Sequence, residues 1–136
     1  MLKHQALTDQ ILQAFYTRVY HRLGYGFLEK VYENAMALEL RHMDLKVEQQ
    51  KEISVFYGDE TVGVYYADLV VADAVIVELK ATSAIAPEHE AQLLNYLRAT
   101  PYEVGLLLNF GPKPEFRRKA FDNVRKTFSW LPDSSL

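Results

Sequence analysis

The chain has 136 residues, of which 49% are hydrophobic, and this size and composition suit one domain built around one core. A net charge of −3 gives no support to a protein that coats nucleic acid constitutively, and the absence of cysteine excludes disulfides, zinc–thiolate sites and thiol nucleophiles. The first ten residues lack an apolar signal core, and no apolar stretch approaches the ~20 residues that span a bilayer. We therefore expect a single domain, residues 1–136, without membrane contact and in the cytoplasm.

Apolar residues recur at helical spacing near the N-terminus. Four of them repeat every four positions: Leu7, Ile11, Phe15 and Val19. This spacing predicts an amphipathic helix, which should end at the breaker Gly24-Tyr25-Gly26. A second helix is expected from about Phe27 to Met43.

Two runs rich in Val, Tyr, Ile and Leu follow. Val47–Tyr57 indicates one strand or two short ones, and Gly58-Asp59 predicts a hairpin turn into a strand over Thr61–Val71. Ala74–Ala81 is apolar on both faces until Glu78, which is typical of a central strand. These last two strands meet at residues 72–74, so they should form an antiparallel hairpin.

The second half of the chain predicts a strand–helix–strand unit. Pro87 suits the first turn of a helix that runs to about Ala99, and Glu103–Phe110 is a continuous buried strand, expected to lie parallel to the strand over 74–81. The tail, Glu115–Trp130, favours an amphipathic helix, with a short strand at its start as the alternative. The predicted fold class is α/β or α+β, a mixed sheet of four or five strands flanked by helices.

The hairpin carries the most informative residues. If Val71 pairs with Val75, Asp68 lies opposite Glu78, and alternation along the strand puts Glu78 and Lys80 on the same face. Two carboxylates facing each other destabilise a strand pair unless a cation lies between them. The bland alternative is that Glu78 and Lys80 form a surface salt bridge at a strand end.

The functional interpretation is a Mg²⁺ or Mn²⁺ site. Asp68 and Glu78 would bind the ion, with the backbone carbonyl of Leu79 as a third ligand. Lys80 could orient or help to deprotonate the attacking water, or stabilise the pentavalent charge, and electrostatic assistance is the safer role beside two carboxylates.

This arrangement resembles the core of the PD-(D/E)XK nuclease superfamily, in which a hairpin carrying Asp and Glu-x-Lys precedes a helix and an apolar strand. The superfamily's usual proline before the aspartate is absent, and Ala67 stands there. The resemblance implies a restriction-endonuclease-like core and divalent-metal-dependent cleavage of nucleic acid.

A narrower resemblance lies in the second predicted helix and beyond. Residues 26–32 (GFLEKVY) match the G-x-x-E-x-x-Y signature of a family of small bacterial proteins within that superfamily. Residues 92–97 (QLLNYL) and 104–111 (VGLLLNFG) resemble that family's later blocks, and the whole match covers roughly Leu7 to Arg118.

The signature residues each have a structural alternative. Glu29 in the first turn of a helix interacts favourably with the helix dipole, whereas the resemblance implies that it points at the metal site and orients Lys80 or a water. Tyr32 is interpreted mainly as a packing residue whose hydroxyl could also bind a site carboxylate, and Gly26 as the residue that allows the helix to start.

Further candidates lie on the third helix and the tail. Gln92 resembles an extra motif of exonuclease branches of the superfamily, where it holds a phosphate or a catalytic water; the alternative is a solvated helix position. Tyr96 is expected to flank the core. Arg117, Arg118 and Lys119 form a local positive segment that could contact a phosphate backbone, although a normally charged amphipathic helix explains them equally well.

The sequence thus predicts a Mg²⁺-dependent nuclease that acts on DNA in preference to RNA and selects for structure or ends. The rival hypothesis is a binding module of nuclease fold that recruits a protein or nucleic-acid partner without turnover. A third hypothesis is a homo-oligomeric scaffold in which the aromatic first helix (Phe15, Tyr16, Tyr20) forms the interface.

Overall fold

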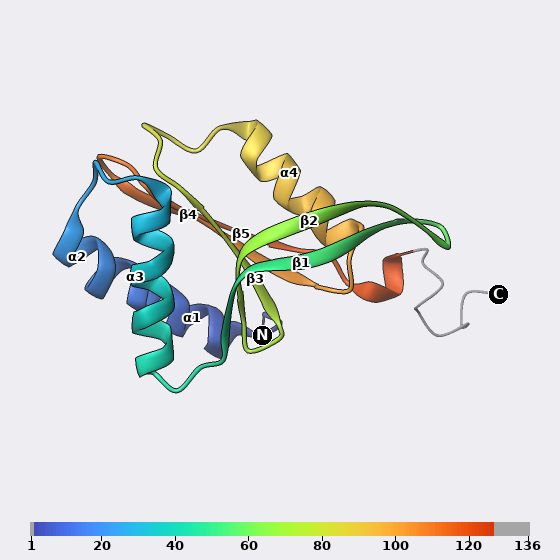
Figure 1. Ribbon diagram of the computed structural model, residues 1–136, viewed down its shortest axis with the longest axis horizontal. Helices are drawn as coiled ribbons and strands as arrows, with labels where there is room; N and C mark the ends of the chain where they lie inside the picture. The colour runs from blue at the N-terminus through green and yellow to red at the C-terminus, as the bar shows by residue number, and fades with distance from the viewer. Residues whose placement is uncertain (1, 127–136) are drawn as a thin grey trace.

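One five-stranded sheet separates two layers of helices (Figure 1). The computed structural model describes residues 2–126. The strands lie in the order β1-β2-β3-β4-β5, so each strand pairs with its neighbour in sequence. Their bounds are β1 Val47–Tyr57, β2 Glu60–Val71, β3 Val75–Lys80, β4 Val104–Phe110 and β5 Pro114–Ala120.

The N-terminal helices cover one face of the sheet and α4 covers the other. The first helical stretch is continuous: α1 Gln5–Gln13, the π-helical segment η1 Ala14–Val19 and α2 Tyr20–Leu23. It ends at Gly24, whose φ of 63° is a conformation that glycine adopts without steric cost, as the sequence predicts. The second helix, α3, spans Glu29–His42, and α4 spans Pro87–Arg98.

The predicted register between β2 and β3 is correct. Val71 pairs with Val75, Val70 with Ile76 and Leu69 with Val77, all antiparallel. The two turn residues Ala72 and Asp73 have φ of 53° and 54°, the left-handed geometry that a two-residue hairpin turn needs for its strands to keep the twist of the sheet.

The strand–helix–strand prediction is also confirmed. β3 and β4 are parallel, with Glu78 opposite Leu107 and Lys80 opposite Asn109. All seven residues of β4 are buried because helices cover both faces of this central strand. The structure is therefore a mixed five-stranded sheet flanked by helices, of the α+β type.

The tail prediction is wrong in its main form. Residues 114–120 form β5, which pairs antiparallel with β4 along its whole length. In the part of the chain described up to residue 126, β5 is followed by a single 3₁₀ turn, η2 Asn123–Arg125. The segment forms a strand because β4 is fully buried, and the N–H and C=O groups on its outer edge need hydrogen-bond partners that a neighbouring strand supplies. The end of the predicted helix, including Trp130, lies outside the described residues.

Two apolar clusters fill the two sides of the sheet. Residues of α1, η1 and α3 pack on one side against alternate residues of β3 and β4, and Leu93 and Leu97 of α4 pack on the other against Ile76 and Leu107. Within residues 2–126, no helix is long and apolar enough to cross a bilayer.

Candidate active site

The strands β2 and β3 separate one residue before the predicted carboxylate pair. Their backbone pairing stops at Leu69 and Val77, so Asp68 and Glu78 lie at the mouth of a fork. The Oδ2 atom of Asp68 accepts a hydrogen bond of 2.8 Å from the backbone N–H of Leu79, which takes the place of the next ladder bond. The fork therefore brings the Asp68 carboxylate onto β3 beside Glu78.

Glu78 is a mostly buried carboxyl group that lacks a full set of hydrogen-bond donors. Its pKa is raised to about 8, mainly because a charge loses hydration inside the protein. Lys80 and the Asp68 amide lower the pKa, and the nearby Glu29 and Glu33 carboxylates add to the rise. Its Oε1 atom is buried, and no residue within 2–126 donates a hydrogen bond to it. Such a carboxyl is protonated at neutral pH unless a cation binds it.

Asp68 shares its surroundings with Glu78. Burial raises the pKa of Asp68, and the negative charge of Glu33 adds to this rise. Hydrogen bonds from the Leu79 amide and the Gln50 side chain lower the pKa, as does the positive charge of Lys80. Since Glu33 and Lys80 act on both carboxyl groups, the two groups lie in one electrostatic neighbourhood. The register that places Asp68 and Glu78 at matching positions of the hairpin is confirmed, and their role as metal ligands beside Lys80 stays a prediction.

Helix α3 supplies two further carboxylates. Glu29, its first residue, is exposed and close enough to raise the pKa of Glu78, which supports the expectation that it faces the site. Glu33, one turn later, is only 3% exposed and was not predicted as a site residue. Its spacing of four residues from Glu29 was the available signal, because such residues share one helix face.

Glu33 is held by three side-chain donors. Burial opposes its ionisation, but hydrogen bonds from Lys30 at 2.9 Å, Gln49 at 2.7 Å and Gln50 at 2.6 Å keep its pKa below the usual range. Gln50 also donates to Oδ1 of Asp68 at 3.2 Å. Nothing in the sequence singles out Gln50, because its role depends on tertiary contacts between β1, α3 and β2.

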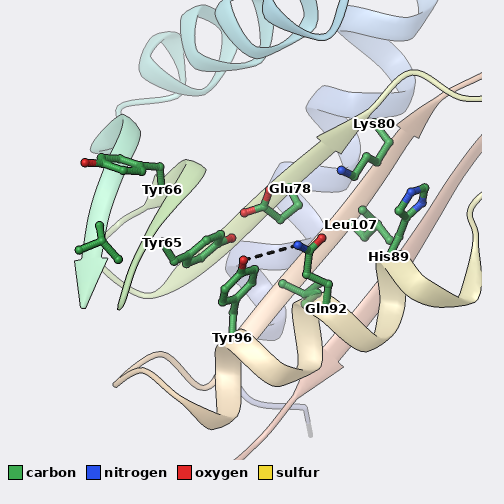
Figure 2. Close-up of a pocket in the computed structure, with 10 residues that line it drawn as sticks. Tyr65, Tyr66, Glu78, Lys80, His89, Gln92, Tyr96 and Leu107 are labelled. Carbon is green, nitrogen blue, oxygen red and sulfur yellow. Dashed lines mark hydrogen bonds between the residues drawn. The ribbon is translucent and has the colours of Figure 1, made fainter. Parts of the chain in front are cut away.

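A pocket opens between the β3 side of the fork and α4 (Figure 2). Glu78 and Lys80 line it from β3, and Gln92, His89 and Tyr96 line it from α4. Gln92 is exposed and lines this pocket, and its role at the site stays a prediction.

The pocket is also lined by residues that were not predicted as site residues, among them His89 and Tyr65. His89 of α4 lines the pocket, and its Nδ1 accepts the Ala86 N–H at 3.2 Å. Tyr65 of β2 stacks on Tyr96 with ring centroids 3.6 Å apart, and its buried hydroxyl lacks a partner among residues 2–126. The Gln92 Nε2 donates a hydrogen bond of 3.4 Å to the Tyr96 hydroxyl, so polar groups of α4 line this side of the pocket.

The loop before α3 explains the spacing of the G-x-x-E-x-x-Y residues. Gly26 has φ of 110°, which disfavours any residue with a side chain. The Tyr32 hydroxyl donates to the Gly24 carbonyl at 2.7 Å and accepts the Phe27 N–H at 3.2 Å. The alternative in which this hydroxyl binds a site carboxylate is wrong, because the loop's own backbone groups occupy it.

Tyr32→Phe is expected to destabilise the fold by about 1–3 kcal/mol, since the buried ring stays stacked on Phe110 but two backbone groups lose their partner. Urea denaturation measures this change in the free energy of unfolding. Tyr57→Phe is the matched control, because Tyr57 is 79% exposed. Equal stability of the two variants would show that the Tyr32 hydroxyl does not hold the loop.

The three cations predicted to bind nucleic acid do not form one patch. On β5, Lys119 and Arg117 approach Glu90 of α4 at 2.9 and 3.6 Å, whereas the Arg118 side chain donates to the backbone carbonyl of Lys3 near α1. Alternation along a strand sends neighbouring side chains to opposite faces, which a helical tail would not do. Of the three cations, Arg117 is the one in register with the site: Leu107 of β4 pairs with Glu78 on one side and with Arg117 on the other.

Two of the three aromatic residues of the first helix, Phe15 and Tyr20, pack inward. Phe15 is fully buried with its ring edge on Phe110, at a centroid distance of 4.8 Å, and the Tyr20 hydroxyl donates to the Gly111 carbonyl at 2.7 Å. Of the three rings proposed as an oligomer interface, only Tyr16 is substantially exposed. This helix stabilises the monomer's own core.

The donor set suits a hard divalent cation. Among residues 2–126, no group of three or more His, Cys, Asp or Glu side chains is arranged as a metal site made by protein ligands alone. Asp68 and Glu78 offer carboxylate oxygens, and Mg²⁺ commonly binds through one or two carboxylates while keeping several waters. The unpartnered Oε1 of Glu78 is the observation that a cation would explain.

Comparison with known proteins identifies the family of the chain. The family model described as the PD-(D/E)XK nuclease superfamily matches residues 5–119, and the chain belongs to that superfamily. The superfamily prediction is thereby confirmed, and membership supports a nuclease function.

Two solved structures share the fold. The crystal structure of SSO0001 has a TM-score of 0.51 and 15% identity, and the match covers 90% of this chain and 62% of that one. An alkaline exonuclease (LHK-Exo) from Laribacter hongkongensis has a TM-score of 0.51 and 12% identity, with coverage of 92% and 74%. A search of curated proteins gave no match.

Proposed function

We propose that this protein is a nuclease that depends on Mg²⁺ or Mn²⁺, of the G-x-x-E-x-x-Y type, and that it cleaves DNA in preference to RNA. The observation that carries the proposal is the buried Glu78 carboxyl: it has an unpartnered oxygen, a pKa raised to about 8, and Lys80 and Asp68 beside it. Ionisation of such a group destabilises the metal-free fold, so a functional role explains why it is present.

Asp68 and Glu78, with the Leu79 carbonyl, would hold the ion. When bound, a divalent ion supplies charge neutralisation at the phosphoryl oxygens and makes an attacking water more acidic. Lys80 presents a positive charge to the same pocket, where it favours the developing negative charge of the transition state. Glu29 from α3 and Gln92 from α4 flank this centre and would orient the water and the scissile phosphate.

The proposed selectivity is for nucleic-acid ends or structures rather than for a base sequence. The described chain has few residues outside the core that could read base edges in a groove, and its basic residues on β5 are partly neutralised by Glu90. One structural neighbour is titled an alkaline exonuclease, which is consistent with processing of ends.

The first test is whether divalent ions bind the folded protein. Adding Mn²⁺ or Mg²⁺ should raise the melting temperature, because a ligand that binds only the native state stabilises it by about 2.7 kcal/mol at a hundredfold excess over Kd. Calorimetric titration measures Kd directly. A melting temperature that does not respond to either ion at pH 9 would contradict the proposal.

The second test is cleavage of labelled linear, nicked and single-stranded DNA and of RNA, with and without EDTA. We expect metal-dependent cleavage, greatest on DNA substrates with ends. Metal binding without any cleavage would instead support the binding-module hypothesis, in which the same site recruits a protein or nucleic-acid partner.

A further inference from the structure

Strand β1 is irregular where it faces Asp68. Gln49 pairs with Leu69 and Lys51 with Ala67, but Gln50 and Asp68 between them make no ladder pair. Gln50 has φ of 49°, in the left-handed region that residues other than glycine seldom adopt. Strained backbone of this kind persists when the surrounding structure holds it, and it is common at functional sites.

The irregularity changes which face of the hairpin is buried. Before it, Val47 of β1 and its partner Val71 pack in the cluster under α3. Beyond it, Ile53 and its partner Tyr65 pack in the cluster under α4, although the spacing along each strand is an even number of residues. The buried face of the β1–β2 hairpin therefore changes at Gln50 and Asp68, from the α3 side of the sheet to the α4 side.

The Gln50 amide links α3 to the fork. Its Nε2 donates to Oε1 of Glu33 at 2.6 Å and to Oδ1 of Asp68 at 3.2 Å, which uses both of its N–H groups. Glu33 is itself fixed by Lys30 and Gln49, so it forms a rigid anchor for the amide. With Oδ2 of Asp68 on the Leu79 N–H, both Asp68 oxygens are held in place.

We propose that Gln50 and Glu33 are positioning residues for the divalent-metal site, an inference that rests on the proposed function. The Gln50 amide orients the Asp68 carboxylate, and the buried Glu33 carboxylate both anchors that amide and adds a negative charge that attracts the ion. Outer residues that orient metal ligands change metal affinity by about 10–100-fold when they are replaced.

The sharpest variant is Gln50→Gly. Glycine adopts a φ of 49° without strain, so the backbone conformation is retained while the side chain with its amide is removed. Relief of backbone strain and loss of the amide's hydrogen bonds to Glu33 and Asp68 act in opposite directions on stability, so the metal-free variant should melt close to the wild type. It should nevertheless bind Mn²⁺ about tenfold more weakly in calorimetric titration. Weaker Mn²⁺ binding without a comparable loss of stability is a result that a purely structural role for Gln50 does not produce.

Ala72→Gly is the matched control. Ala72 has a similar φ of 53° but lies in the exposed β2–β3 turn, so the substitution relieves the same kind of strain and should leave Mn²⁺ affinity unchanged. Glu33→Gln, which keeps the size of the side chain and removes its charge, should weaken Mn²⁺ binding at least as much as Gln50→Gly.

The outcomes separate the two proposals. If the wild type binds Mn²⁺ and Gln50→Gly binds it equally well, the positioning role is overturned and the proposed function is left intact. Wild type that does not bind Mn²⁺ at all overturns the proposed function, and the positioning role with it.

Discussion

Glu78→Gln is expected to raise the stability of the metal-free protein at pH 9 and, at the same time, to abolish stabilisation by Mn²⁺. The physical reason is that the buried Glu78 carboxyl has a pKa of about 8, against 4.5 for the ordinary group. Ionising it inside the folded protein costs free energy that the neutral glutamine does not incur, and a bound cation is what offsets that cost.

The sign of the pH dependence follows from this raised pKa. The folded-state pKa lies above the unfolded value, so the contribution of Glu78 to stability is fully present below pH 4.5 and is lost as the pH rises to about 8. At about 1.4 kcal/mol per pH unit, the loss by pH 9 has an upper bound of about 5 kcal/mol. Divalent-ion affinity runs the other way and rises with pH up to about 8, since binding must displace the proton.

Thermal denaturation of both proteins in EDTA from pH 5 to pH 9, repeated with Mn²⁺, measures these effects. Wild type should lose stability relative to Glu78→Gln as the pH rises, and Mn²⁺ should restore it only in wild type. Glu60→Gln is the control, because Glu60 lies exposed at the tip of the β1–β2 hairpin. Parallel pH profiles for wild type and Glu78→Gln would show that the buried carboxyl is not the titrating group.

Lys80→Ala is expected to lower cleavage by about 10²–10⁴-fold while the protein still binds Mn²⁺. Lys80 lines the pocket beside Glu78, where its charge can stabilise the transition state or assist the attacking water. Its removal should also raise the pKa of Glu78, since Lys80 now lowers it. Metal affinity is therefore best compared at pH 9.

Single-turnover cleavage of labelled DNA and calorimetric titration of Mn²⁺ test this separation of catalysis from binding. Lys113→Ala, which removes an exposed cation from the β4–β5 turn, controls for the general loss of positive charge. If Lys80→Ala cleaves as fast as wild type, the observed activity does not arise at this site, and the binding-module hypothesis gains support.

The local sequence determined the hairpin and the order of the elements. Apolar runs broken by Ala72-Asp73 predicted the β2–β3 register, and that register alone brought Asp68 near Glu78. Strand pairing is a local geometric rule with a period of two residues, so the positions of these carboxylates follow from counting. The tail was misjudged because helical and strand spacing both fit Phe116 and Ala120, and only the unpaired edge of β4 decides between them.

Only the tertiary structure decided the rest of the site. The burial that raises the pKa of Glu78, the Glu33 carboxylate from α3 and the pocket wall from α4 all depend on how the two helical layers close on the sheet. The left-handed Gln50 that joins α3 to Asp68 is held by contacts between residues 17 and 18 positions apart. Sequence spacing predicts which face a residue occupies, whereas desolvation and bonds between elements arise only when those faces meet.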